Sequence, residues 1–267
     1  MKSTTILFPW LIEGGSAKTT TTINIASALA RDGKRVLAVD LDETGKLTMR
    51  LGMNPETLYP TLSHVYTEGE QISKVVKKSD FGFDIIPGHP LLGALQDALE
   101  PGDEPLLKKH LAPVLADYDF VLLDARPGTH PLSYAALTAA DYLIMPMRAQ
   151  ADSLKGVSQT IDFLRDVIWQ DFNPDLKTIG ILPVMVRRIS PNALGVVKKA
   201  RESWGNKVLP FEVPITDLFS KEFAEGTPAI VLNPKHEASQ AYVRLAKAVI
   251  KTVDRDKAKA KKTKAKK

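Results

Sequence analysis

The sequence has 267 residues, of which 44% are hydrophobic and 25% are charged. A chain of this size buries a large core, and we expect one α/β domain over residues 1–254. The absence of cysteine excludes a disulfide framework, thiolate metal sites and cysteine catalysis. The sequence contains no apolar run of about eighteen residues and no recognisable signal peptide. We therefore expect a cytoplasmic protein.

The positive charge of the sequence is concentrated at its carboxyl end. The formal net charge is +5, and residues 257–267 contain seven lysines and no acid, so the rest sums to 5 − 7 = −2. This segment has no apolar period with which to pack. We expect a domain boundary near Asp254 and a disordered lysine-rich tail over residues 255–267. The tail either binds polyanions or only aids solubility.

Apolar segments alternate with helical patterns along the chain. Residues 4–12 are apolar and end at Gly14-Gly15, after which residues 19–30 carry apolar side chains at helical spacing. Further short apolar runs, each an expected strand, occupy residues 34–39, 83–86, 120–123, 142–145, 178–184 and 207–210. This alternation predicts an α/β fold with a doubly wound, mostly parallel sheet and helices on both faces. Ligands bind such sheets at the carboxyl ends of the strands.

The segment Glu13–Thr20 lies between the first expected strand and the first helix, where a phosphate-binding loop belongs. Its backbone N–H groups can surround phosphate oxygens at the amino end of the helix. Lys18 can reach the β- and γ-phosphates, and the Thr19 hydroxyl can complete a Mg²⁺ shell. The alternative is an ordinary strand-to-helix turn. The expected nucleotide-binding residues are Gly14, Gly15, Ser16, Ala17, Lys18, Thr19 and Thr20.

Two acids stand at the ends of expected strands. Asp42 lies just beyond the second strand, where it can orient a water for attack on the γ-phosphate and join the metal site. Asp124 follows the apolar run 120–123 and is expected to hold Mg²⁺ directly or through water. Residues 126–128 would form the loop that senses the γ-phosphate. Each acid alone fits a solvated strand end, whereas their ordered combination favours a nucleotide site.

In order and spacing, these motifs resemble the ParA/MinD family of deviant Walker ATPases, and the resemblance extends over residues 4 to about 252. Residues 18–48 are similar to the family's first two motifs, and residues 117–147 are similar to its Walker B segment with the following helix. The resemblance implies ATP and Mg²⁺ as cofactors, an ATP-dependent homodimer, and weak hydrolysis stimulated by a partner. It also implies that adenine lies near Pro214, Thr216 and Asp217.

Two positions depart from the family pattern. Glu13 stands where the family has a signature lysine that contacts the partner subunit's phosphates, and Ala17 replaces the glycine before the catalytic lysine. A carboxylate about 4 Å from a phosphate is repelled by on the order of 1 to 4 kcal/mol, so Glu13 should turn away. The sequence in this respect resembles the McdA-type subgroup, which distributes carboxysomes and supplies a later lysine. Lys155 is the expected catalytic substitute, and Arg148 is the alternative.

The resemblance further implies that the ATP-bound dimer binds nonspecific DNA and distributes a cargo, such as a carboxysome or a plasmid, through a small adaptor protein. Contacts with DNA phosphates add salt-sensitive affinity without sequence preference. The expected DNA-binding residues are Arg187, Arg188, Lys198, Lys199 and Arg201, with the lysine tail as an addition. Simple solvation of these charges is the alternative. We expect a nucleoid-associated protein.

Two rival functions remain open. A membrane-associated ATPase similar to MinD would need a terminal amphipathic helix, and residues 238–253 show such a pattern. Packing of this helix against the sheet explains the pattern more simply, so no membrane is expected. The other rival is a nucleotide-binding switch with little or no hydrolysis, which the substitutions Glu13 and Ala17 keep open. Retention of Lys18, Thr19, Asp42 and Asp124 favours an active site.

Overall fold

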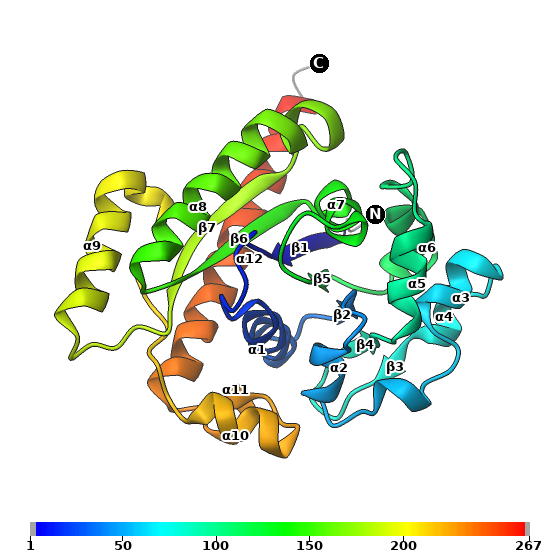
Figure 1. Cartoon of the computed structure of the whole chain (residues 1–267), viewed down its shortest axis with the longest axis horizontal. Coiled ribbons are helices and arrows are strands. Elements are labelled where there is room, and N and C mark those ends of the chain that lie inside the picture. Colours follow the sequence, from blue (N-terminus) through cyan, green and yellow to red (C-terminus); the bar gives the residue numbers. More distant parts are fainter. Residues whose placement is uncertain (1–3, 265–267) are drawn as a thin grey trace.

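The structure is a computed structural model, and it describes residues 4–264. Within them, seven strands form one sheet in the order β3-β4-β2-β5-β1-β6-β7 (Figure 1). All neighbouring strands are parallel except the pair β3 and β4. The strands are β1 (Thr5–Pro9), β2 (Val36–Asp40), β3 (Lys77–Lys78), β4 (Asp84–Ile86), β5 (Phe120–Asp124), β6 (Tyr142–Arg148) and β7 (Lys177–Val184).

Helices connect the strands and cover the sheet. They are α1 (Lys18–Arg31), α2 (Lys46–Met49), α3 (Leu62–Thr67), α4 (Ile72–Val75), α5 (Leu91–Ala98), α6 (Leu106–Leu115), α7 (Pro131–Ala139), α8 (Ala151–Phe163), α9 (Pro191–Trp204), α10 (Leu218–Glu225), α11 (Ala229–Leu232) and α12 (Glu237–Lys264). Two short 3-10 turns are η1 (Pro55–Thr57) and η3 (Gly205–Lys207), and the π-helical segment η2 (Leu164–Phe172) continues α8. No helix within residues 4–264 is long and apolar enough to cross a membrane.

Both faces of the sheet are buried, because successive strand side chains point to opposite sides. In β1, Ile6 and Phe8 pack in one core cluster with side chains of α5, α6, α7 and α8. Leu7, between them, packs in the second cluster with side chains of α1 and α12. Tyr242 of α12 is fully buried in this second layer, and its hydroxyl lies 3.2 Å from the Thr21 hydroxyl of α1. The predicted doubly wound architecture is confirmed.

The segment 207–210 is not a strand of the sheet. Its first residue ends the turn η3, and only an isolated parallel bridge joins Val208 to Ile181 of β7. The Leu209 N–H donates to the Ile181 carbonyl at 2.9 Å, and the next hydrogen bond of this segment to β7 is made only by the Val213 N–H, which donates to the Pro183 carbonyl at 2.9 Å. The apolar pattern therefore marks a short extended segment at the edge beside β7.

The carboxyl-terminal segment also differs from the expectation. Helix α12 does not end near Asp254 but continues to Lys264, so the described part of the expected tail is helical. Alanine and lysine both favour helix, and lysines near the carboxyl end suit the helix dipole. Asp256 also anchors this part, because its carboxylate accepts hydrogen bonds from the Tyr142 hydroxyl and the Lys177 ammonium group, both at 3.1 Å. Residues 265–267 lie outside the described residues.

Candidate nucleotide-binding site

The connection from β1 to α1 forms a tight loop at the carboxyl edge of the sheet. Gly15 and Ala17 both adopt left-handed backbone conformations, with φ of 68° and 58°. Only glycine adopts this conformation without crowding of a Cβ atom. The Ser16 hydroxyl donates to the Glu13 carbonyl at 3.4 Å, which closes the turn. The loop thus has the curvature expected of a phosphate-binding loop.

Lys18 is folded back onto this loop. Its ammonium group donates to the carbonyl oxygens of Glu13 at 2.8 Å and Leu11 at 3.3 Å. Burial lowers the pKa of Lys18 to about 8, and the negative charges of Asp124 and Glu13 oppose that effect. Desolvation of the cation is therefore only partly compensated by these neighbours. A phosphate group placed at the loop would supply the missing negative charge.

Three acids gather at the ends of the adjacent strands β2 and β5. Asp40 and Asp124 are register partners, and both are almost fully buried. Burial first, and then the charge of Asp40, raises the pKa of Asp124 to about 7, while burial raises the pKa of Asp40 to about 6. The neighbouring Thr19 side chain opposes this rise in the pKa of Asp124, and the Thr22 hydroxyl donates to the Asp124 carboxylate at 3.4 Å. This uncompensated negative charge next to a threonine hydroxyl suits a divalent cation.

Asp40 acts as an anchor for the loop that carries Asp42. One oxygen of Asp40 accepts from the Thr48 hydroxyl at 2.7 Å and the Thr48 N–H at 2.9 Å, and the other accepts from the Asp42 N–H at 3.1 Å. The Asp42 carboxylate in turn accepts from the Thr44 hydroxyl at 2.7 Å and lies 3.8 Å from the Lys46 ammonium group. Asp42 is thereby fixed beside the phosphate-binding loop. The sequence offered no motif that distinguished the supporting role of Asp40.

Two cavities adjoin this loop. The first, of about 240 Å³ and here named the phosphate cavity, is lined by Gly15, Ser16, Ala17, Lys18, Thr19, Thr20, Asp42, Lys46, Arg50, Ala125, Pro127 and Met185. The second, of about 330 Å³ and here named the base cavity, is lined by Ala17, Thr20, Arg50, Val184, Met185, Val213, Phe219, Ser220, Phe223 and Tyr242. The two share Ala17, Thr20, Arg50 and Met185. Together they have the polar and apolar parts that a nucleotide requires.

The expected adenine contacts line neither cavity. Pro214 pairs with Val186 in an isolated bridge, and the Thr216 hydroxyl accepts from the Leu218 N–H at 3.2 Å at the start of α10. Asp217 is exposed. The base cavity instead uses residues on either side of the expected segment, namely Val213 before it and Phe219, Ser220 and Phe223 after it.

Met185 and Arg50 are site residues that the sequence motifs do not mark. Met185 follows β7 in a left-handed conformation with φ of 55°, which is uncommon for a residue with a side chain, and it borders both cavities. Arg50 follows α2, and its guanidinium group reaches the boundary between the cavities. A signal for Arg50 existed only in the topology, because the loop after the second strand of such a sheet lies beside the first loop.

Glu13 points away from the phosphate cavity, as repulsion from a phosphate predicts. Its carboxylate accepts hydrogen bonds from the Arg148 guanidinium group and, at 3.1 Å, from the Ser153 hydroxyl. A Cβ at Gly156 would lie 2.6 Å from a Glu13 carboxylate oxygen and 3.2 Å from the Glu13 Cβ, so a larger residue at this position of α8 would displace the Glu13 side chain. Arg148 also contacts the Asp152 carboxylate at 3.3 Å. Arg148 is thus engaged by two acids, whereas Lys155 is exposed on α8 and lines neither cavity.

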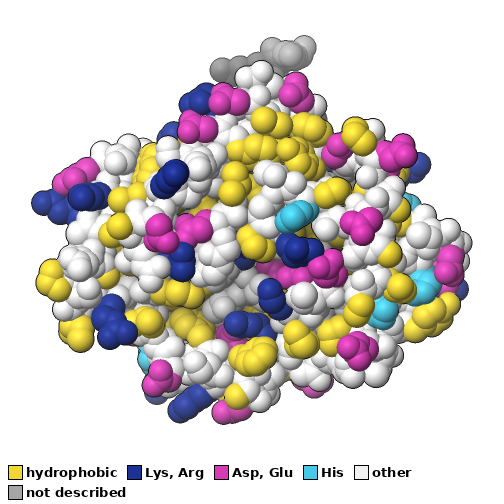
Figure 2. Space-filling model, in the orientation of Figure 1, with side chains coloured by type: hydrophobic (Ala, Val, Ile, Leu, Met, Phe, Trp, Pro, Cys, Tyr) yellow, Lys and Arg dark blue, Asp and Glu magenta, His cyan; other side chains and the backbone are white. Residues whose placement is uncertain are grey.

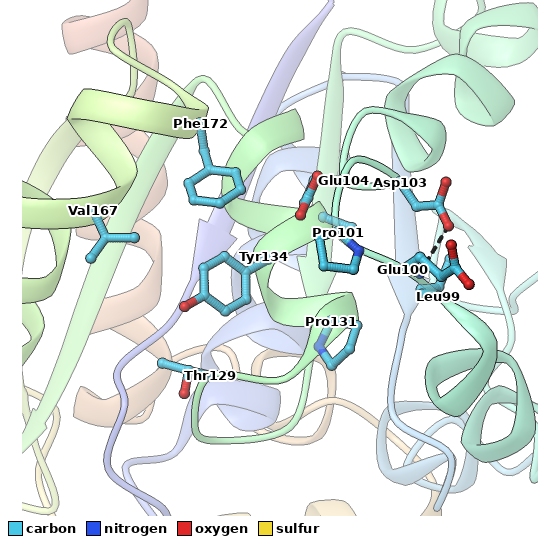
Figure 3. Close-up of a pocket in the computed structure, with 11 residues that line it drawn as sticks. Leu99, Glu100, Pro101, Asp103, Glu104, Thr129, Pro131, Tyr134, Val167 and Phe172 are labelled. Carbon is cyan, nitrogen blue, oxygen red and sulfur yellow. Dashed lines mark hydrogen bonds between the residues drawn. The ribbon is translucent and has the colours of Figure 1, made fainter.

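The segment after β5 borders the phosphate cavity on one side and an apolar cavity on the other. Arg126 donates to the Glu43 carboxylate at 2.6 Å, and Pro127 lines the phosphate cavity. The apolar cavity, of about 410 Å³, lies between α7, η2 and the loop before α6, with Tyr134 and Phe172 facing it (Figure 3). Thr129 and Pro131 line the apolar cavity. Movement of the segment 125–131 would therefore alter both.

Three of the five basic residues expected to bind DNA are paired with acids. Arg188 is paired with Glu237 at 2.5 Å, Arg201 with Glu212 at 3.0 Å, and Lys198 with Glu202 at 3.8 Å. Arg187 and Lys199 both line an open groove between α8 and α9. In Figure 2, basic side chains over α9, at the left, are interspersed with acidic and hydrophobic ones. The structure therefore brings only part of the expected set together.

Among residues 4–264, no group of three or more histidine, cysteine, aspartate or glutamate side chains is arranged to hold a metal ion by itself. A metal at Thr19 and Asp124 would need further ligands from phosphate and water, which is how Mg²⁺ is bound beside nucleotides. A glycine-rich loop with a buried lysine, a threonine hydroxyl and strand-end acids defines a P-loop nucleotide-binding protein.

Comparison with known proteins specifies the family. Residues 10–178 match the family model described as an AAA domain. The chromosome-partitioning ATPase Soj of Thermus thermophilus is 35% identical over 243 residues, covering 90% of this chain and 93% of that protein. Cobyrinic acid a,c-diamide synthase from Mycobacterium smegmatis, with bound ADP and magnesium, is similar with a TM-score of 0.82 and 29% identity, covering 94% and 96% of the two chains. The chain belongs to the ParA/MinD family of partition ATPases.

The fold is also shared with the ATP complex of McdA from Cyanothece. That structure has a TM-score of 0.83 and 20% identity, and the match covers 93% of this chain and 97% of the McdA chain. At this identity the likeness concerns the fold alone.

Proposed function

We propose that this protein hydrolyses ATP with Mg²⁺ as cofactor, forms a homodimer around the bound nucleotide, and as a dimer binds nonspecific DNA to distribute a cargo through an adaptor protein. The observation that carries the proposal is the convergence of Lys18, Thr19 and Asp42 on the phosphate cavity, with Asp124 held behind Thr19. These groups match the distribution of charge on a metal-bound triphosphate.

The proposed roles of these residues in ATP hydrolysis follow from their present hydrogen bonds. Lys18 exchanges its two carbonyl acceptors for β- and γ-phosphate oxygens, which are stronger acceptors because they are charged. Mg²⁺, when bound at Thr19 and Asp124, neutralises the charge of the β- and γ-phosphates. Asp42, fixed by Thr44 and by the anchor Asp40, orients the attacking water.

The seam between two subunits needs positive charge, since two triphosphates face each other there. Glu13 and Arg148 neutralise one another, so neither supplies it. We assign this role to Lys155, which is exposed at the amino-terminal half of α8 and is free of the Glu13 network. In this assignment the chain behaves like the McdA-type subgroup. Carboxysomes or plasmids are the proposed cargo.

DNA binding is assigned first to Arg187 and Lys199, because the other expected residues are partly neutralised by acids. Binding of this kind loses affinity as salt rises and shows no sequence preference. On this proposal the protein is cytoplasmic and associates with the nucleoid through DNA. A membrane role is disfavoured, because the apolar side of α12, including Leu245 and Val249, is buried against the core.

The test of the proposed function is phosphate release by purified protein with Mg²⁺-ATP, with and without random-sequence duplex DNA, together with calorimetric titration of ATP. We expect saturable ATP binding and slow release of phosphate. Absence of ATP binding in the presence of Mg²⁺ would overturn the proposal.

The same assay addresses a second candidate, a nucleotide-binding switch that does not hydrolyse ATP. The departures from the family pattern at Glu13 and at the left-handed Ala17 keep this candidate open. ATP binding without any phosphate release, including after addition of DNA, supports the switch over the ATPase.

A further inference from the structure

Arg50 occupies the one stretch of wall that the phosphate cavity and the base cavity have in common, with Thr20, Ala17 and Met185. Lys18 and Thr19 mark the end of the phosphate cavity where the outer phosphates bind. Phe219 and Tyr242 belong to the base cavity alone. A nucleotide that spans both cavities therefore places its innermost phosphate and its ribose at the shared wall.

The guanidinium group of Arg50 is fixed by three neighbours. Its Nη1 donates to the Thr20 hydroxyl at 2.8 Å and to the Glu222 carboxylate at 3.0 Å. The group also lies 5.5 Å from the centre of the Phe223 ring, within the range of a cation–π contact. A side chain with this much support loses little further conformational freedom when a ligand binds.

Glu222 is a buried carboxylate that holds the Arg50 guanidinium group in place. It is 0% exposed, and its Oε2 accepts from the Asn24 amide at 2.6 Å and the Ala229 N–H at 2.9 Å. Burial raises the pKa of Glu222, and the hydrogen bonds and Arg50 oppose this effect. An unpaired carboxylate in this position would be strongly destabilising, so Arg50 and Glu222 form an interdependent pair.

Arg50 keeps donors free for a ligand. Both of its hydrogen bonds to described residues use Nη1, and its side chain is 24% exposed. A guanidinium group has five N–H donors in a planar fork, so Nε and Nη2 remain available at the wall of the cavities. Phosphate oxygens are the acceptors that this fork matches best.

We infer that Arg50 binds the α-phosphate of the nucleotide and that Glu222 positions it for this contact. Because the assignment presupposes the ATP binding proposed above, it is tested within the set of nucleotides that the wild-type protein binds. An α-phosphate contact is made equally by ATP, ADP and AMP, and is absent with adenosine. The site thereby selects phosphorylated nucleosides before the metal and the outer phosphates contribute.

The experiment compares Arg50→Met and Arg50→Lys with the wild type, using competition of ATP, ADP, AMP and adenosine against a fluorescent ATP analogue with Mg²⁺. We expect Arg50→Met to weaken ATP, ADP and AMP by a similar factor of about 10- to 100-fold, the range for a charge-assisted hydrogen bond, with adenosine unchanged. Arg50→Lys keeps the positive charge but not the planar fork of donors, so its nucleotide affinities should lie between those of the wild type and those of Arg50→Met. The control is Arg244→Met, whose guanidinium group stacks on Phe211 and lines neither cavity.

Loss of the arginine leaves Glu222 buried without its cation, so Arg50→Met is also combined with Glu222→Gln. Glutamine retains an oxygen for Asn24 and Ala229, and the double variant should regain the unfolding temperature without regaining nucleotide affinity. An unchanged affinity for all three nucleotides overturns the inference. So does a loss confined to ATP, which would place Arg50 at the γ-phosphate, or an equal loss for adenosine, which would place it at the base. If the wild type binds no nucleotide, the proposed function fails instead.

Discussion

At the phosphate-binding loop, residue type and backbone conformation agree at Gly15 and disagree at Ala17. Both adopt positive φ, but only alanine has a Cβ that crowds the following carbonyl oxygen. The loop retains its shape because α1 begins directly after Ala17 and is buried in the core from Thr20 to Leu29. The cost of the strained residue is thus met by the surrounding structure.

Ala17→Gly should therefore stabilise the protein by about 0.5–1 kcal/mol, because glycine accepts the left-handed conformation. Thermal or urea denaturation measures the change. The matched control is Ala224→Gly in α10, where the conformation is helical and the same substitution should destabilise by about 1 kcal/mol. Destabilisation by both substitutions would contradict the assignment of strain to Ala17.

Asp42 is the residue on which turnover depends in the proposed mechanism. We predict that Asp42→Ala still binds ATP, because it removes a negative charge from the phosphate cavity, and that it releases phosphate at least 100-fold more slowly, in line with losses of a few kcal/mol for catalytic groups. The measurement is phosphate release together with the ATP retained after gel filtration. Asp80→Ala, an exposed acid in a remote turn, is the control. A variant at Asp42 that hydrolyses at the wild-type rate would contradict this role.

At the scale of elements, α8 separates the two cationic side chains that the sequence offered for the dimer interface, Lys155 as the expected residue and Arg148 as the alternative. Arg148, at the end of β6, is tied to Glu13 and Asp152 across the amino end of α8. Lys155 stands on the exposed surface of the same helix. The helix therefore holds one cation in an internal ion pair and leaves the other exposed, where the proposed partner subunit could contact it.

Lys155→Ala should abolish dimerisation in the presence of Mg²⁺-ATP while leaving the monomer folded, because an exposed lysine contributes little to the stability of the monomer. Sedimentation velocity with ATP bound to the slowly hydrolysing Asp42→Ala background gives the oligomeric state. Lys251 is an exposed lysine on a different helix, α12, and Lys251→Ala serves as control. Normal dimerisation of the Lys155 variant would contradict this role. Loss of the dimer in Arg148→Ala but not in Lys155→Ala would assign the role to Arg148.

Sequence patterns located most elements because each carried its own local signal. The apolar runs of β1, β2, β5, β6 and β7, and the glycine turn before α1, depend on burial and periodicity. Residues 207–210 carried the same apolar signal, yet they make only an isolated bridge to β7, because Lys207 still belongs to the turn η3 and the contact with Ile181 is not continued. Arg50 and Glu222 carried no local signal, because their pairing depends on contact between α2 and α10, which are far apart in the chain.

At the scale of the whole molecule, the excess of positive charge lies at the carboxyl end of the chain and not at the nucleotide site. The sequence without residues 257–267 has a net charge of 5 − 7 = −2, and the lysines of residues 257–264 lie on the last part of α12 rather than on a free tail. A helix spaces these charges along one rod, so several can contact one DNA duplex together. The rod is anchored at Asp256 by Tyr142 and Lys177.

A chain truncated after Asp256 keeps those anchors, and we predict an unchanged unfolding temperature and unchanged ATP affinity. It loses seven lysines, so its affinity for random duplex DNA should fall and the slope of log K against log salt should become shallower by about 0.9 for each lost phosphate contact. Fluorescence anisotropy at several salt concentrations measures both. A full-length variant with glutamine at Lys259, Lys261 and Lys262 keeps the helix and removes positive charge from its exposed end. If its affinity and slope equal those of the wild type, these lysines of α12 do not contact DNA, and the groove with Arg187 and Lys199 becomes the principal contact surface.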